Sequence, residues 1–260
     1  MLADYITYLI DLDGVVYRGE ELLPGAKEFI DRLNANHKKY LFPTNNSFAS
    51  EAQVVAKLTR LGIATDNSHV LGAGQAAVQN IERRFPGANV YVIGEQPLCD
   101  MVRAHGLRVA DLTDASADVV LIGLDRSFDY KKLTAAVLAV RAGAPFIAIN
   151  RDPLLPVADG FVPGCGTMVA AIEAGSGVTP EVVGKPQPML LQEALRLLES
   201  KPEEAVMIGD NLGVDILAGK AAGTHTLLVL SGKDTRASLE VSPIKPDYVY
   251  ENLAALLAEM

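Results

Sequence analysis

Short apolar runs alternate with amphipathic helical patterns along almost the whole chain, and this alternation restricts its fold more than any other feature. The apolar runs occupy residues 6–10, 40–42, 90–93, 119–122, 146–149, 205–208 and 226–230. The helical patterns between them occupy residues 26–34, 51–61, 75–85, 98–105, 130–141, 168–174, 189–198 and 216–222. Strands that alternate with helices are typical of parallel sheets covered by helices. We therefore predict an α/β fold with a mostly parallel sheet.

The first apolar run ends in two aspartates, Asp11 and Asp13, with one residue between them. Residues two apart in an extended chain point the same way, so both carboxylates aim at one place beyond the end of the strand. Open α/β sheets bind their ligands at that edge. Two like charges held together need a cation or a shared proton. The pair therefore suggests a metal, acid–base chemistry or both, and a polar loop after a core strand is the plainer alternative.

Two further polar segments also follow strand-like runs. Thr44, Asn45, Asn46 and Ser47 offer hydroxyl and amide groups that suit phosphate oxygens, although the same residue types favour turns. Lys185 stands between a glycine and a proline, where a constrained turn would present a fixed positive charge to an anion. An ordinary solvated lysine is the alternative at that position.

The run 205–208 leads into a fourth polar segment. Asp210 follows it after a glycine, and Asp215 lies five residues later at the start of a helical pattern. Asp210 is suited to complete a set of oxygen ligands for Mg2+, which prefers oxygen donors and keeps some of its waters. Asp215 is suited to cap the helix or to bind a water on the metal.

Composition excludes several classes of protein. The chain has 260 residues, of which 49% are hydrophobic, so one large or two modest domains are expected. A net charge of −9 argues against nucleic-acid binding and requires local positive charge for any anionic substrate. We expect no signal peptide and no membrane span. Two distant cysteines, Cys99 and Cys165, indicate a reducing, cytoplasmic setting.

The order of the four polar segments strongly resembles the haloacid dehalogenase (HAD) superfamily of phosphohydrolases. More closely, the chain resembles the NagD-type branch, which includes para-nitrophenyl phosphatases, over essentially its whole length. Further matching stretches are residues 23–25, 90–95, 147–152 and 215–219. The resemblance implies a Rossmann-like parallel-sheet core at 1–78 and 180–260, with an inserted α/β cap of the C2 type at 79–179. It also allows a homodimer formed through the cap.

The resemblance implies a phosphatase that cleaves phosphate monoesters of small metabolites, such as sugar phosphates, phosphoglycolate or nucleotides. Asp11 would be the nucleophile that forms an aspartyl-phosphate, and Asp13 would be the acid and then the base. Thr44 would bind a phosphoryl oxygen, and Lys185 would neutralise charge between nucleophile and phosphate.

The implied cofactor is Mg2+. Its ligands would be Asp11, the backbone carbonyl of Asp13, and Asp210, with Asp215 supporting the metal through a water. The positive charges of the metal and of Lys185 would then invert the local field for an acidic substrate.

The implied substrate-binding residues come from both the core and the cap. They are Thr44, Asn45, Asn46, Lys185, Asn150 and Asp152. The chain departs from vertebrate pyridoxal phosphate phosphatases at Leu154 and Leu155, where those proteins have a tryptophan and a histidine. This difference argues against a preference for pyridoxal phosphate. Cys165, in a cap loop, is interpreted as a packing or substrate-facing residue.

One alternative of a different class is a NAD(P)-dependent oxidoreductase. The turn Gly72-Ala73-Gly74 begins a Gly-x-Gly-x-x-Ala pattern, and the acid Glu95 follows about 20 residues later, as in dinucleotide-binding folds. This reading leaves the four aspartates and Lys185 unexplained.

Overall fold

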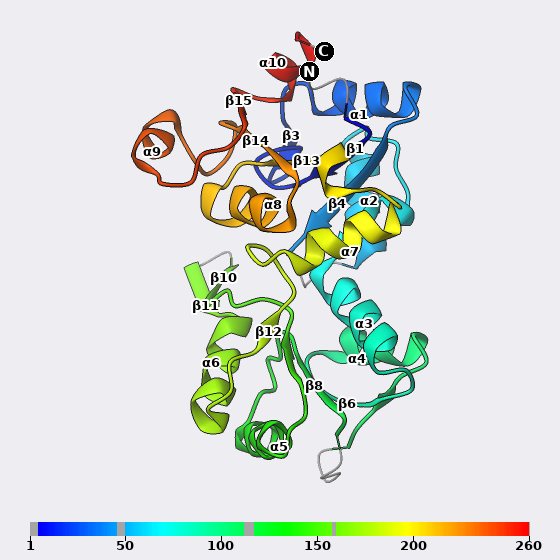
Figure 1. Ribbon diagram of the computed structural model, residues 1–260, viewed down its shortest axis with the longest axis vertical. Coiled ribbons are helices and arrows are strands. Elements are labelled where there is room, and N and C mark those ends of the chain that lie inside the picture. Colours follow the sequence, from blue (N-terminus) through cyan, green and yellow to red (C-terminus); the bar gives the residue numbers. More distant parts are fainter. Residues whose placement is uncertain (1–4, 46–49, 112–116, 158–159, 260) are drawn as a thin grey trace. The chain divides into compact units, whose positions relative to one another are not determined.

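The computed structural model describes residues 5–45, 50–111, 117–157 and 160–259 (Figure 1). The chain divides into two compact units. The core unit comprises Met1–Gly72 and Lys185–Met260, and the inserted unit comprises Ala73–Gly184. The inserted unit extends beyond the range 79–179 at both ends. That it selects the substrate as a cap remains a prediction.

The core unit contains a six-stranded sheet whose neighbouring strands all pair in parallel. Its strand order is β15-β14-β13-β1-β4-β5, with bounds Tyr248–Tyr250, His225–Val229, Ala205–Gly209, Thr7–Ile10, Lys39–Thr44 and Val70–Gly72. Leu9 of β1 pairs with Met207 on one side and with Leu41 on the other. The strands that precede three of the polar segments are therefore direct neighbours. β15 was not predicted, because its three half-buried residues form no apolar run.

Helices cover this sheet and bury its apolar side chains. They are α1 (Ala26–Ala35), α2 (Glu51–Arg60), α7 (Met189–Leu197), α8 (Leu217–Ala222), α9 (Arg236–Val241) and α10 (Leu253–Leu257). Tyr8 of β1 packs edge-on against Phe29 of α1 within the hydrophobic core. At the start of α2, the Gln53 backbone N–H donates to Ser50 Oγ, and the Ser50 N–H donates to Gln53 Oε1. The predicted N-cap of this helix is confirmed.

Short elements complete the core unit. A two-stranded hairpin pairs β2 with β3, 3-10 turns form η2 and η3, and a π-helical turn forms η4. Their bounds are Tyr17–Arg18, Glu21–Leu22, Asn67–His69, Pro202–Glu204 and Leu212–Ile216. η4 matters most for function, because it carries Asp215.

The inserted unit, coloured from cyan to green in Figure 1, contains a second parallel sheet. Its order is β12-β9-β8-β6-β7, with bounds Glu181–Val182, Phe146–Ala148, Val119–Ile122, Asn89–Ile93 and Arg108–Val109. Its helices are α3 (Ala73–Arg84), α4 (Gln96–Ala104), α5 (Tyr130–Arg141) and α6 (Cys165–Ser176). A hairpin pairs β10 (Leu154–Val157) with β11 (Gly160–Pro163). In the described part of the chain, no helix is long and apolar enough to cross a membrane.

The two sheets exclude the dinucleotide-binding alternative. That fold needs the strands before and after the glycine-rich turn to lie in one sheet. Here β5 belongs to the six-stranded sheet and β6 to the five-stranded sheet. Gly74 lies inside α3, and a Cβ there would meet Ile149 Cδ1 at an ordinary 3.6 Å, so the backbone does not require glycine. The oxidoreductase reading is wrong because a local pattern does not reveal which sheet a strand joins.

Candidate active site

Three neighbouring strands end in polar residues at the same edge of the core sheet. Asp11 directly follows β1, Asp210 directly follows β13, and Thr44 is the buried last residue of β4. The Asp11 N–H donates to the Ile208 carbonyl of β13 at 2.9 Å, which continues the parallel ladder to the site. Because β1 lies between β13 and β4, the sheet brings these residues together.

A cluster of three carboxylates lies at this edge. One oxygen each of Asp11, Asp210 and Asp215 lies within 4.8 Å of the other two. Among the described residues, this is the group that could hold a metal ion through side chains. Carboxylate oxygens are hard donors, so the set fits Mg2+. The Asp13 side chain is exposed and outside this group, and the implied role of its carbonyl stays a prediction.

Lys185 joins the cluster from a distant part of the chain. Its Nζ donates to Asp11 Oδ1 at 2.5 Å and to Asp215 Oδ1 at 2.7 Å, and its side chain is only 2% exposed. Burial lowers the pKa of this lysine, but the two facing carboxylates outweigh burial and raise the pKa above its ordinary value. Lys185 is therefore a permanent positive charge within the cluster.

The carboxylates outnumber this charge, and their pKa values reflect the imbalance. Burial raises the pKa of Asp11 to about 7; the Lys185 ammonium opposes that rise, and the Asp215 charge adds to it. Burial likewise raises the pKa of Asp210 to about 6, against the hydrogen bond from the Lys233 backbone. Crowded buried carboxylates bind a proton or a cation more readily than solvated ones. The cluster therefore favours cation binding.

Glycines and a backbone donor position Asp210. A Cβ on Gly14 or on Gly232 would collide with the Asp210 carboxylate, and the Lys233 N–H donates to Asp210 Oδ2 at 2.6 Å. Gly14 also has a φ of +80°, which favours glycine. Sequence reasoning missed the loop at 231–234. Its position after the apolar run 226–230, at the same end of a parallel strand, is the signal that could have revealed it.

Asp215 divides its two oxygens between the backbone and Lys185. Oδ2 accepts from the Asn211 N–H at 3.2 Å, while Oδ1 accepts from Lys185 Nζ. A Cβ on Gly209 would collide with the Asp215 side chain, so this close approach requires glycine before Asp210. Asp215 is thus a local cap and a counter-charge to Lys185, in addition to its place in the carboxylate cluster.

Asn45 contacts Lys185 rather than standing apart from it. Its Nδ2 donates to the Lys185 carbonyl at 2.7 Å, and its Oδ1 accepts from the Lys185 N–H at 2.8 Å. Its implied substrate contact stays a prediction. Asn46, the other amide of this segment, lies outside the described residues.

The implied cap residues lie on the loop after β9. Asn150 is buried, and its Oδ1 accepts from the Asp152 N–H at 3.2 Å, whereas the Asp152 side chain is exposed. Cys165, the first residue of α6, is buried, and burial raises the pKa of its thiol to about 12. Such a thiol stays protonated at neutral pH, which fits a packing residue.

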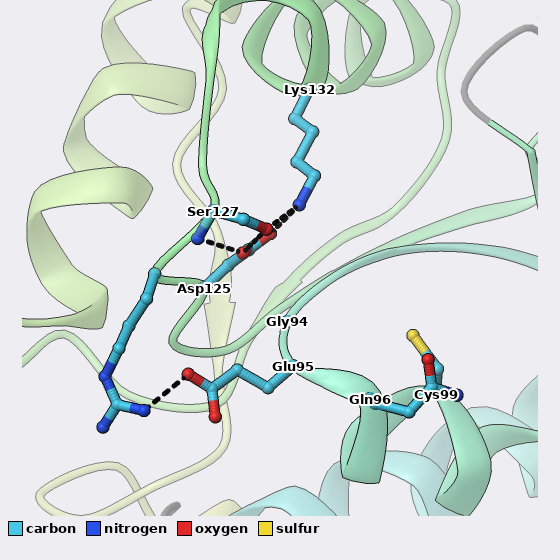
Figure 2. A pocket seen from close by; sticks show the side chains of 8 residues that line it. Gly94, Glu95, Gln96, Cys99, Asp125, Ser127 and Lys132 are labelled. Carbon is cyan, nitrogen blue, oxygen red and sulfur yellow. Dashed lines mark hydrogen bonds and ion pairs between the residues drawn. The ribbon is translucent and has the colours of Figure 1, made fainter.

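The inserted unit has a polar cavity of its own, of about 500 Å³ (Figure 2). Residues after β6 and β8 line it. Figure 2 shows Lys132 and Ser127 meeting the Asp125 carboxylate, which the Lys132 Nζ contacts at 2.6 Å. Arg126 pairs with Glu95 at 2.8 Å. Each acid in this cavity therefore has its own cation, unlike the acids of the core cluster.

Comparison with known families places these features in context. A family model described as haloacid dehalogenase-like hydrolase matches residues 8–108, and a second, described as HAD-hydrolase-like, matches residues 182–256. An acid sugar phosphatase of Staphylococcus epidermidis is 37% identical over 259 residues, which cover 100% of this chain and 99% of the relative. The chain belongs to the haloacid dehalogenase-like hydrolases. It is a phosphatase of that family, as predicted.

Solved structures refine this membership. The thermostable p-nitrophenylphosphatase of Bacillus stearothermophilus superposes with a TM-score of 0.88 at 41% identity, covering 96% of this chain and 97% of that one. NagD from E. coli K-12 gives 0.87 at 32% identity, covering 96% and 97%. A glycerol phosphate phosphatase of Mycobacterium tuberculosis, in complex with magnesium, gives 0.86 at 35% identity, covering 97% and 76%. The predicted NagD-type branch and α/β fold are confirmed.

Proposed function

We propose that this protein is a Mg2+-dependent phosphatase that hydrolyses phosphate monoesters of small metabolites, with sugar phosphates as the favoured class. One observation carries the proposal: three carboxylates at the edge of the core sheet surround one buried ammonium. That arrangement pairs a nucleophile with a cation site and a fixed positive charge, as phosphoryl transfer needs. The acid sugar phosphatase relative supports the substrate class.

In the proposed reaction, a carboxylate oxygen of Asp11 attacks the phosphorus of the ester. The new bond is Asp11 O–P, the broken bond is that between phosphorus and the ester oxygen, and Asp13 gives its proton to the leaving alkoxide. Asp13, now a carboxylate, then takes a proton from a water that attacks the aspartyl-phosphate. Inorganic phosphate leaves, and both acids return to their starting states.

Lys185 and the proposed metal have distinct electrostatic roles. Lys185 already contacts the nucleophile, so its charge offsets the repulsion between Asp11 and an incoming phosphate. Asp11, Asp210 and the Asp13 carbonyl would hold Mg2+, which supplies charge neutralisation at the phosphoryl oxygens. The surplus of carboxylates over cations in the cluster and the raised pKa of Asp210 support this assignment. Thr44 is proposed to bind a phosphoryl oxygen.

Metal dependence is tested with p-nitrophenyl phosphate and a panel of sugar phosphates. Chelation with EDTA should abolish turnover, and Mg2+ should restore it. Turnover that persists after exhaustive chelation would refute the metal assignment. A higher kcat/KM for nucleotides than for any sugar phosphate would refute the substrate class while leaving the chemistry intact.

The covalent intermediate is tested with Asp13→Asn. An amide cannot protonate the leaving group, but p-nitrophenolate leaves without help. The variant should therefore release a burst of about one p-nitrophenolate per active site and then stall, because water is not activated. A simple alkyl phosphate should give no burst. Equal behaviour of the two esters would contradict the acid role of Asp13.

We also propose that the inserted unit is a cap that selects the leaving group through the loop around Asn150 and Asp152. The exposure of the Asp152 side chain supports a role in contacting substrate, whereas the Asn150 contact supports the turn itself. Asp152→Ala and Asn150→Ala should change relative kcat/KM among physiological esters and barely affect a small artificial ester. Uniform loss across all esters would mean that the residue only supports the loop.

A further inference from the structure

We propose that Asn45 is a positioning residue that holds Lys185 in place, and that its contribution to phosphate binding passes through that lysine. This inference rests on the proposed function, because it assumes that Lys185 neutralises the substrate phosphate. It differs from the expectation that the Asn45 side chain binds the substrate itself.

The geometry consists of two reciprocal hydrogen bonds. The Asn45 amide donates to the Lys185 carbonyl at 2.7 Å and accepts from the Lys185 N–H at 2.8 Å. Both polar groups of the Lys185 backbone are thereby bound by one side chain that lies 140 residues away in sequence. Lys185 is also the first residue of the second segment of the core unit, so the pair fixes the chain where it enters that unit.

The chemistry of the contact selects asparagine. One side chain must supply a donor and an acceptor side by side, and an amide does this in a single plane. Aspartate would place a carboxylate oxygen against the Lys185 carbonyl, and alanine would leave both backbone groups without this partner. Both groups lie in a partly buried region, so replacement has a cost.

The far end of the same residue explains why this position matters. The Lys185 ammonium meets Asp11 at 2.5 Å and Asp215 at 2.7 Å within a buried site. Its flexible stem has no rigid geometry of its own, so the position of the ammonium depends on where the backbone is anchored. Displacements of about 1 Å at a catalytic group can cost on the order of 100-fold in rate. Asn45 anchors that backbone on the β4 side of the site, and η4 supplies Asp215.

The test is a double-mutant cycle read by the binding of inorganic phosphate, which requires no turnover. Isothermal titration with saturating Mg2+ compares the wild type with Asn45→Ala, Lys185→Met and the double variant. We expect the Kd for phosphate to rise about 10-fold in Asn45→Ala and about 100-fold in Lys185→Met. The double variant should match Lys185→Met within about twofold, because Asn45 has no lysine left to position.

Two results would overturn the inference, and they differ from each other. If the effects multiply in the double variant, to about 1,000-fold, Asn45 binds phosphate independently of Lys185. If Lys185→Met leaves phosphate binding unchanged, both the inference and the proposed role of Lys185 fail. Should either single variant not fold, Asn45→Ser or Lys185→Gln takes its place in the same cycle, with the same outcomes.

A matched control separates positioning from general stability. Asn252 caps α10, where its Oδ1 accepts from the Ala255 N–H at 3.0 Å. Asn252→Ala therefore also removes a contact between an asparagine and the backbone, but outside the carboxylate cluster. Its thermal midpoint should fall, while its phosphate Kd stays within about twofold of the wild type. A 10-fold weaker phosphate affinity in this control would reduce the Asn45 effect to lost stability.

Discussion

The two parallel sheets of this protein end in polar residues of the same kinds but with different charge balance. At the edge of the core sheet, Asp11, Asp210 and Asp215 surround the single ammonium of Lys185. In the cavity of the inserted unit, Asp125 pairs with Lys132, and Glu95 pairs with Arg126. The first set has an excess of negative charge, and the second is neutral.

This difference separates a reactive cluster from a stabilising one. Buried like charges are costly, and a protein retains them where a cation or a substrate will balance them. Matched pairs need no outside partner, and a buried, hydrogen-bonded one holds its loop in place. Architecture alone does not distinguish the two edges, because both follow the ends of parallel strands. Charge balance does, and variants of each set should therefore have opposite consequences.

The largest effect should come from Asp11→Asn. Without the nucleophile, kcat should fall by at least about 10⁴-fold. The free energy of unfolding should change by less than about 1 kcal/mol, because the variant also relieves the crowding of carboxylates. Assays with p-nitrophenyl phosphate and urea denaturation measure both. Substantial turnover would remove Asp11 from its proposed role, and a large loss of stability would break the comparison.

Lys185→Met should damage both activity and stability. The loss of its charge should lower kcat by about 10²- to 10³-fold. It also leaves Asp11 and Asp215 buried without their cation, so the metal-free protein should lose about 3 kcal/mol of unfolding free energy. Chemical denaturation in EDTA measures this loss. An unchanged stability would mean that the carboxylates take up protons at little cost.

Asp210→Ala should weaken Mg2+ binding more than Asp215→Ala. We assign Asp210 a direct bond to the metal, so its loss should raise the Kd for Mg2+ by about 10- to 100-fold. Asp215 uses its oxygens for Asn211 and Lys185, so its loss should have a smaller effect. Calorimetric titration of both variants decides the order, and the reverse order would exchange their roles.

Gly232→Ala should act like a mild form of Asp210→Ala. The added Cβ would collide with the Asp210 carboxylate and displace it, so we expect about 10-fold weaker Mg2+ binding. Gly213→Ala is the matched control, because the nearest atom to its Cβ would be Asn211 Oδ1 at 3.7 Å. Calorimetry should show near wild-type Mg2+ affinity in the control. Equal losses in both variants would argue against the proposed fit around Asp210.

Asp125→Asn should change stability and leave turnover of p-nitrophenyl phosphate unchanged. The Lys132 and Ser127 contacts outweigh burial and hold the pKa of Asp125 below its ordinary value. A lowered pKa stabilises the fold above the unfolded value of about 3.9, and this contribution is lost as the pH falls. The variant should lose about 2 kcal/mol at pH 7 and less at pH 3. A constant difference between pH 7 and pH 3 would contradict the ionic origin.

Local patterns in the sequence were enough to predict most strands and helices and three of the residues that meet at the core edge. The apolar runs that became β1 and β13 are continuous and buried, so they indicate strands without help from the rest of the chain. Asp11 and Asp210 follow them directly, and the parallel-sheet rule then places both at one edge. The capping box of α2 is equally local, because its partners lie three residues apart.

The tertiary structure alone decided which partners these residues have. Asn45 meets Lys185 from 140 residues away, and Gly14 meets the Asp210 carboxylate that a distant strand delivers. It also assigned β5 and β6 to separate sheets, although their local pattern resembles one continuous unit. Periodicity and turn chemistry act over a few residues, so a sequence can determine where strands end. Which side chains then share a buried site depends on strand order and on the packing of loops that only the folded chain brings together.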